Sequence, residues 1–183
     1  INTDKVMGSL KGEIDTDVEV TILRNKQKKR IIIRRGEIPM ETITTFCMLD
    51  KTTGYIRIDQ FSVPTHDEFV IAADGLLNQG MKKMVLDLRG NPGGVMDAAI
   101  LIADEFLPSG VNIVSTKGRN VENEVVKAKP GGVLEKIKLA VLIDENSASA
   151  AEILAGAMQD NDRALLYGRR TYGKGLVQQD QIL

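Results

Sequence analysis

Two segments of the chain repeat the order of a buried strand, a short polar turn and an amphipathic helix. The first has an apolar strand over 84–88 and a helix over 95–106, and the second has a strand over 139–144 and a helix over 150–159. Strands that lead through a turn into a helix predict βαβ crossovers and a parallel sheet, so we expect an α/β fold. The two polar turns should lie close together at the carboxyl edge of the sheet, where open α/β sheets bind their ligands.

The remaining segments after residue 50 supply further elements of the same sheet. Alternating apolar residues predict a strand over 54–59, and a helix capped by Thr65 is expected to run to about Gln79. Apolar pairs on either side of a polar centre predict a hairpin within 111–133. A strand over 164–167 and an extended stretch over 176–182 complete the pattern.

The first 35 residues predict a smaller piece of structure. A weakly amphipathic helix over 4–10 precedes an alternating strand over 17–23, and a polar loop over 25–29 leads into the β-branched run Ile31–Ile33. A piece of this size buries too little apolar surface to form a core without further strands.

A proline marks the boundary between the two parts. Pro39 removes a backbone donor and favours extended geometry in the residue before it. We therefore expect an incomplete domain over 1–36 and an α/β domain over 37–183, with the last strands of the second domain lying beyond the chain.

Charge and rare residues exclude several classes of function. Lys and Arg number 24 against 25 Asp and Glu, and this balance argues against a nucleic-acid footprint or a polybasic membrane surface. Cys47 is the single cysteine and His66 the single histidine, so an internal disulfide and a Cys/His zinc site are excluded. No apolar run reaches the roughly 20 residues that cross a bilayer, and the residues that begin at Ile1 do not show the charged and apolar regions of a signal peptide. We expect no metal and no cofactor.

Two serines lie in the second polar turn, directly before a predicted helix. Small residues surround Ser147 and Ser149, and such residues allow a substrate backbone to approach closely. The unpaired N–H groups and positive dipole of a helix start also stabilise a developing oxyanion. Serine at a helix start is more often only a cap, so from this turn alone either serine can be the cap or a nucleophile.

A nucleophilic serine needs a base, and the sequence offers two candidates. His66 lies in a polar stretch at a predicted helix start, where an exposed surface histidine is the simpler interpretation. Lys174 lies between two glycines and before an apolar stretch, where burial would favour its neutral amine. A lysine at a strand end that extends its ammonium group into water is the alternative.

The first polar turn contains two adjacent glycines. Gly93 and Gly94 can turn their backbone N–H groups into a cleft and donate to an oxyanion, or they can form a tight turn without a ligand. The turn lacks the ending of a phosphate-binding loop and the glycine spacing of a dinucleotide site.

Three blocks of sequence closely resemble the signature blocks of the carboxyl-terminal processing (tail-specific) proteases, in the same order and spacing. They are Asp87–Gly94, Asn146–Ala157 and Tyr172–Gln179. The resemblance implies a protease core of crotonase-like and caseinolytic-protease-like βαβ units, preceded over the first 35 residues by the second half of a PDZ domain.

The resemblance also implies a role for individual residues. Ser149 falls on the nucleophile, Lys174 on the general base and Gln178 on the residue that orients the lysine. Gln178 follows Lys174 by an even number of positions, so both would share one face of an extended segment. Ala151 replaces a third serine that many relatives carry. The other implied site residues are Ala150 with Gly93 or Gly94 as oxyanion donors, and Asp160 as a supporting carboxylate.

The implied activity is that of a serine endopeptidase that forms an acyl-enzyme through a Ser-Lys dyad. Its expected substrates are proteins or peptides with apolar carboxyl termini, and the expected location is the bacterial periplasm or cell envelope. Homo-oligomers are compatible with this interpretation. A peptide-binding scaffold or an inactive fragment with the same fold is the alternative. An acyl-CoA enzyme of the crotonase type is disfavoured because such enzymes use paired carboxylates.

Overall fold

The computed structural model describes residues 3–36, 41–119 and 121–177. The chain divides into two compact units, Ile1–Met40 and Glu41–Leu183. The boundary expected at 36/37 touches residues outside the described part of the chain.

The smaller unit contains one helix and one hairpin. Helix α1 (Thr3–Leu10) precedes the antiparallel strands β1 (Asp17–Arg24) and β2 (Gln27–Arg34). The loop between the strands is shorter than the predicted 25–29, because Asn25 and Lys26 both have positive φ and form a two-residue turn. Such turns match the twist of paired strands. The alternation predicted for β1 is confirmed, since every second residue is partly shielded.

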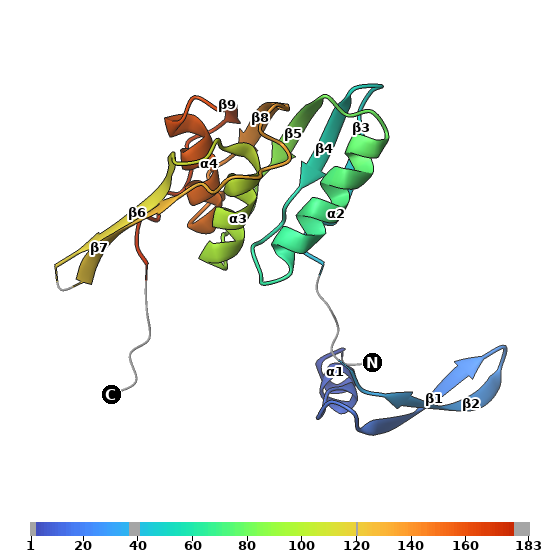
Figure 1. Ribbon diagram of the computed structural model, residues 1–183. Helices are drawn as coiled ribbons and strands as arrows, with labels where there is room; N and C mark the ends of the chain where they lie inside the picture. The colour runs from blue at the N-terminus through green and yellow to red at the C-terminus, as the bar shows by residue number, and fades with distance from the viewer. Residues whose placement is uncertain (1–2, 37–40, 120, 178–183) are drawn as a thin grey trace. The chain divides into compact units, whose positions relative to one another are not determined.

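The larger unit is built on a five-stranded sheet, shown in Figure 1. Parallel pairing joins β4, β5, β8 and β9, as the repeated strand–turn–helix pattern predicts. The sheet is mixed, because β3 joins β4 in antiparallel pairing. In spatial order the strands are β3 (Thr45–Met48), β4 (Thr53–Arg57), β5 (Lys83–Asp87), β8 (Lys138–Ile143) and β9 (Ala164–Gly168).

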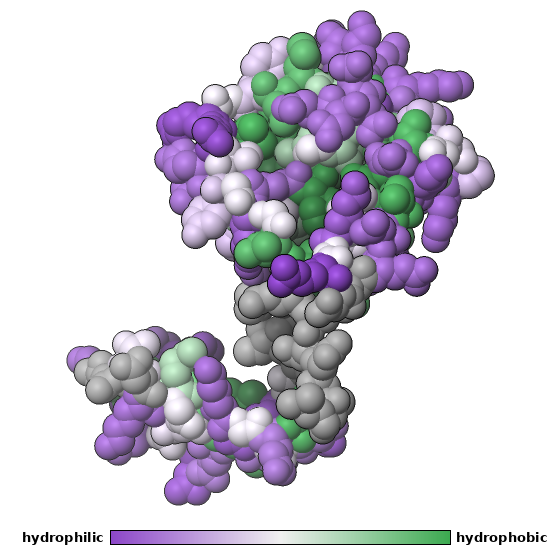
Figure 2. Space-filling view, turned by 90° about the vertical axis from the view of Figure 1, so that its left-hand side faces the viewer, coloured by the Kyte–Doolittle hydropathy of each residue, from purple (hydrophilic) through white to green (hydrophobic). Residues whose placement is uncertain are grey.

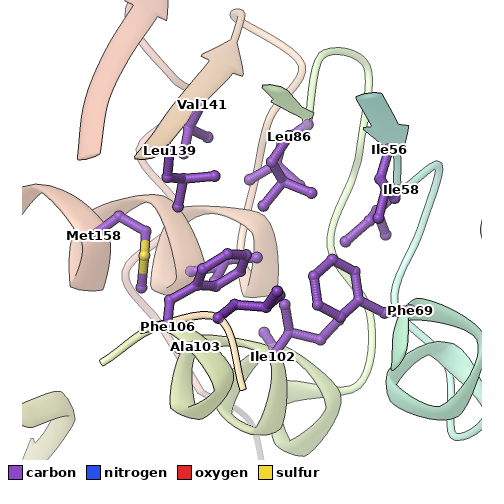
Figure 3. Packing of buried hydrophobic residues seen from close by; sticks show 14 of the residues in the cluster. Ile56, Ile58, Phe69, Leu86, Ile102, Ala103, Phe106, Leu139, Val141 and Met158 are labelled. Atoms are coloured by element: carbon purple, nitrogen blue, oxygen red, sulfur yellow. The ribbon is translucent and has the colours of Figure 1, made fainter. Parts of the chain in front are cut away.

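Three helices pack on one face of this sheet. The parallel strands advance across the sheet in chain order, so right-handed crossovers place every connecting helix on the same side. Figure 3 shows side chains of β4, β5 and β8 pointing toward those of the helices. The helices are α2 (Thr65–Asn78), α3 (Met96–Phe106) and α4 (Ala150–Asp160).

The core lies between the sheet and these helices. Ile56, Leu86 and Val141 face the helices from three neighbouring strands and are fully buried. Phe69 of α2 meets Phe106 of α3 with ring centroids 5.8 Å apart in a tilted arrangement, which aromatic pairs prefer over a face-to-face stack. This packing fixes where each helix begins relative to the strand before it.

Two further elements differ in detail from expectation. Thr65 is the first residue of α2 and does not cap it, because Pro64 occupies the cap position. The Thr65 hydroxyl instead accepts a hydrogen bond from the N–H of Ser62. The predicted hairpin is confirmed as β6 (Asn112–Gly118) and β7 (Val121–Lys127), an antiparallel pair that extends away from the sheet in Figure 1.

Apolar patches lie between polar side chains on the face of the larger unit shown in Figure 2. Several large apolar side chains are exposed, among them Leu165 and Tyr167 on β9, which pairs only with β8 among the described strands. None of the helices in the described part of the chain is long and apolar enough to cross a membrane.

Arg163 joins distant parts of the larger unit, and its removal is expected to destabilise the fold. Its guanidinium donates to the carbonyl oxygens of Phe106, Leu134 and Ile137 at 2.6–2.7 Å, and it lies 5.6 Å from the Phe106 ring centroid. Arg163→Met should lower the free energy of unfolding by about 2–4 kcal/mol, because buried carbonyl groups lose charged donors. Urea denaturation measures this change, and Arg170→Met, at an exposed arginine, should alter it by less than about 0.5 kcal/mol. Equal stability of the two variants would contradict the role of Arg163.

Candidate active site

The two polar turns meet at the carboxyl edge of the sheet, as the sequence predicts. The N–H of Ala148 donates to the Asn91 carbonyl oxygen at 2.9 Å. The N–H of Gly90 donates to Asp144 Oδ1, also at 2.9 Å. Hydrogen bonds at both ends therefore hold the turn after β5 against the turn after β8.

The structure separates the roles of the two serines. Ser147 is fully buried, its Oγ donates to the Leu88 carbonyl oxygen at 2.8 Å, and it accepts a bond from the N–H of Asp144 at 2.9 Å. Ser149 is partly exposed and has φ 55° and ψ −116° at the start of α4. Non-glycine residues rarely adopt this conformation, and such strain concentrates at functional sites. Of the two serines, Ser149 is therefore the one whose side chain is partly accessible, while the hydroxyl of Ser147 is buried and bonded to the backbone.

The two adjacent glycines near Ser149 differ in their burial and in the hydrogen bonding of their backbone N–H groups. The N–H of Gly93 donates to Asn91 Oδ1 at 2.8 Å, and Gly93 is buried. Gly94 is exposed, and neither its N–H nor that of Ala150 has an acceptor within the described residues. The N–H groups of Gly94 and Ala150 are therefore free to donate to a ligand, while Gly93 provides close packing: a Cβ there would lie 2.7 Å from the Ser149 Cβ.

A buried carboxylate anchors the turn that carries these glycines. Asp87 is fully buried at the end of β5, where it accepts bonds from the Arg89 guanidinium and from the Tyr55 hydroxyl at 2.7 Å. Burial alone would raise the pKa of Asp87, but the bonds from Arg89 and Tyr55 outweigh it and hold this pKa below its ordinary value. The carboxylate stays ionised and fixes where the turn leaves the strand.

Glu152, which the sequence analysis did not single out, links Ser149 to the segment that carries Lys174. Its Oε2 accepts bonds from the N–H of Ser149 at 2.8 Å and from the N–H of Lys174 at 2.9 Å. Its Oε1 accepts the N–H of Gly173 at 2.7 Å. The Ser-x-x-Glu spacing from Ser149 is the signature of a helix capping box, and this signal could have identified it.

The pKa of Glu152 follows from the same contacts. Burial by itself would raise the pKa, but bonds from the Thr171 side chain and from three backbone N–H groups hold it below its ordinary value. The carboxylate is therefore ionised at neutral pH, and its contacts weaken only in acid.

The other predicted residues are placed as follows. The backbone of Lys174 lies beside Ser149, but its side chain is exposed, and it is not in a strand as expected. Gln178 lies outside the described residues. Asp160 is exposed at the far end of α4, about 16 Å along the helix from Ser149, so the structure does not bring it to the site. His66 is mostly buried rather than exposed, and its Nε2 pairs with Glu105 Oε1 at 3.2 Å.

No group of carboxylate, histidine and cysteine side chains suited to a metal ion occurs within the described ranges. The site consists of a hydroxyl, backbone donors, a lysine and the carboxylate that joins them. This set of groups can carry out nucleophilic acyl transfer, in which a backbone pocket stabilises the charge that forms on the carbonyl oxygen.

Comparisons with known proteins place this chain among peptidases. The model of peptidase family S41 matches residues 52–183. The chain is 36% identical over 179 residues to the carboxy-terminal processing protease CtpA of Bacillus subtilis (strain 168), covering 97% of this chain and 38% of CtpA. It is 34% identical to the "probable CtpA-like serine protease" of Staphylococcus haemolyticus (strain JCSC1435), covering 96% of this chain and 35% of that protein.

A solved structure gives the same result. The photosystem II D1 C-terminal processing protease superposes with a TM-score of 0.68 and 28% identity, covering 92% of this chain and 47% of that one. The chain thus spans between about a third and a half of the length of these similar proteins.

Proposed function

The chain belongs to peptidase family S41, and from this membership we propose that it carries the catalytic dyad of a serine endopeptidase that cleaves proteins near their carboxyl termini. One observation carries the proposal: Ser149, strained at the head of α4, shares the Glu152 carboxylate with the backbone of Lys174. This shared carboxylate supports the proposal, because it holds the backbone of an amine-bearing residue close to the backbone of the serine.

In the proposed reaction, the neutral amine of Lys174 accepts the proton of Ser149 Oγ as the oxygen attacks the scissile carbonyl carbon. The N–H groups of Ala150 and Gly94 donate to the oxyanion. Collapse of the tetrahedral intermediate breaks the C–N bond, and lysine returns the proton to the leaving amine. Water then attacks the acyl-enzyme with the same lysine as base, which releases Ser149 and a new carboxyl terminus. Gln178 is proposed to orient the lysine.

The smaller unit is proposed to be the closing part of a PDZ domain. A helix followed by two antiparallel strands supports this interpretation. A PDZ domain would capture the apolar carboxyl terminus of a substrate by strand addition. We also propose a cell-envelope location, as the family resemblance implies, and cell fractionation would test it.

The exposed side chain of Lys174 favours a second candidate for the chain in isolation. A side chain that extends into water is not held against the Ser149 hydroxyl, so its amine is not positioned to take the proton of that hydroxyl. With Lys174 exposed, the chain alone would bind peptides without turnover, as a scaffold.

The formation of an acyl-enzyme tests the proposal. The intact protein is mixed with an unstructured polypeptide that has an apolar carboxyl terminus, quenched in acid within one turnover, and analysed by mass spectrometry. We expect the mass to increase by the amino-terminal fragment of the substrate and the adduct to map to Ser149. Cleavage without an adduct, or an adduct on another residue, would overturn the assignment, and binding without cleavage would support the scaffold.

Glu152→Gln is expected to lower kcat by about 30-fold with little change in KM. The amide keeps the size of the side chain but loses the charge that holds three N–H groups, so Ser149 and Lys174 lose their shared anchor. Because the pKa of Glu152 is depressed, this support is complete above pH 4.5 and lost as the pH falls through the lower folded pKa.

The matched control is Asp160→Asn, a carboxylate at the other end of the same helix, which should leave kcat within twofold. The additional fall in kcat below pH 4.5 that follows protonation of Glu152 should be absent from Glu152→Gln and present in Asp160→Asn, while the fall caused by protonation of the general base remains in both variants. A Glu152→Gln variant with full kcat and an unchanged pH profile would refute this positioning role.

A further inference from the structure

A cavity of about 440 Å³ lies at the carboxyl edge of the sheet, separate from Ser149. Four parallel strands contribute to it where they end. Arg57 is the last residue of β4, Arg89 and Gly90 follow β5, Asp144 follows β8, and Arg169 follows β9. This is the edge at which open α/β sheets bind ligands, and three guanidinium groups line the cavity here.

Each of the three arginines is held by a carboxylate and keeps donors free. Arg57 Nε donates to Asp59 at 2.6 Å, and its Nη2 donates to the Arg89 carbonyl oxygen at 3.3 Å. Arg89 and Arg169 use Nε and Nη2 to bind Asp87 and Glu145. Across the described ranges Nη1 of each has no acceptor. The guanidinium groups are therefore pre-oriented, and each has a free edge.

The charge balance selects the class of ligand. Each arginine has its own carboxylate partner, and Asp144 adds a further negative charge to the lining. Asp144 is turned toward the backbone, where its Oδ1 accepts the N–H groups of Gly90 and Asn146. Three guanidinium groups therefore face four carboxylates, so net charge attracts no anion here, and a phosphate or another polyanion is disfavoured most; a preference for a carboxylate has to come from hydrogen-bond geometry. A single carboxylate can instead accept from the free guanidinium edges, which match its planar geometry.

The cavity and the proposed nucleophile lie at opposite ends of the same two turns. Gly90 lines the cavity, and Gly93, three residues later, packs against Ser149. The short chain between Gly90 and Gly93 limits the distance from the cavity edge to Ser149 to roughly 15 Å. About four extended residues of a substrate would span this distance.

We propose that this cavity binds a carboxylate of the substrate about three to five residues from the scissile bond. This inference rests on the proposed protease function and names the part of the substrate that is held beside the dyad. The carboxylate is either the free carboxyl terminus of the polypeptide or an acidic side chain at that distance.

Three peptides that share one cleavage site and end four residues after it distinguish these sources. The first ends in a free carboxylate, the second in a carboxamide, and the third in a carboxamide after a terminal glutamate. For the intact protein we expect kcat/KM to be about tenfold higher for the first than for the second, the effect of one charge-assisted contact. The third peptide should show the same tenfold higher kcat/KM only if an acidic side chain can supply the carboxylate in place of the free carboxyl terminus.

Two arginine variants assign the preference to the cavity. Arg169→Met should reduce the acid-over-amide ratio to about twofold while leaving cleavage of the carboxamide peptide nearly unchanged. Arg170→Met, at the neighbouring arginine that does not line the cavity, should retain the tenfold ratio. An unchanged ratio in Arg169→Met, or equal loss on both peptides, would overturn the proposal, because the carboxylate would then be bound elsewhere or not recognised.

Binding measurements keep this test independent of catalysis. Fluorescence anisotropy with Ser149→Ala and the same peptides reports the acid-over-amide ratio of affinities without turnover. If the wild-type protein cleaves neither peptide, the protease proposal fails. The cavity proposal is still tested in that case. It requires the acid-over-amide ratio of affinities to be lower in the Ser149→Ala, Arg169→Met double variant than in Ser149→Ala alone.

Discussion

Ser149→Ala is expected to lower kcat/KM for an unstructured, apolar-tailed polypeptide by at least about 10⁴-fold. Without Oγ no acyl-enzyme can form, and only substrate binding and the oxyanion donors remain. The variant should still fold but lose about 1 kcal/mol of stability, because Ser149 is the N-cap residue of α4 and alanine is disfavoured at that position. Steady-state cleavage measured by mass spectrometry, together with urea denaturation, separates lost chemistry from lost structure.

Ser147→Ala is the matched control, two residues away in the same turn. Its hydroxyl is bonded to the Leu88 carbonyl oxygen and to the N–H of Asp144, so its loss should cost about 1–3 kcal/mol of stability. Below the unfolding transition it should retain most of the activity. The reverse result, an inactive Ser147→Ala and an active Ser149→Ala, would show that Ser149 is not the nucleophile.

Local patterns predict most of the larger unit. The apolar strands over 84–88 and 139–144 and the helices after them depend on residues close in sequence, and the structure confirms them with ends displaced by at most one position. Strand β3 was harder to identify because it is only four residues long and largely exposed, so no apolar alternation marks it. Its antiparallel pairing makes the sheet mixed.

Contacts between residues far apart in the sequence could not be predicted, either at the candidate site or elsewhere in the larger unit. Asp87 depends on Tyr55, a partner on the neighbouring strand, and Arg163 on the carbonyl oxygen of Phe106 at the end of α3. Such pairs form only when the sheet and helices assemble, and no local periodicity encodes them. Lys174 shows the opposite case: its apolar flank suggested burial, but the side chain is exposed. Neighbours in sequence did not determine its surroundings.

Lys174→Met is expected to lower kcat/KM by about 10³-fold or more, because the remaining proton acceptor beside Ser149 in the described chain, the Glu152 carboxylate, has a lowered pKa and is already bonded to three backbone N–H groups, which makes it a weak base. Lys174→Arg should be equally inactive, since a guanidinium keeps the positive charge but cannot be deprotonated. Both variants should retain the stability of the wild type, because the side chain is exposed. Lys83→Met, an exposed lysine at the opposite edge of the sheet, is the control and should retain full activity.

Chemical rescue separates a base from a structural lysine. In a Cys47→Ser background, which removes the exposed native thiol, Lys174→Cys is treated with 2-bromoethylamine to place a primary amine at nearly the original reach. Alkylation with 2-bromoethylamine should raise the kcat/KM of the Lys174→Cys variant by at least about a hundredfold. Alkylation with iodoacetamide, which adds a neutral amide, should leave it unchanged. Activity in Lys174→Arg, or rescue by the amide, would show that Lys174 contributes charge or packing and that another group takes the proton of Ser149.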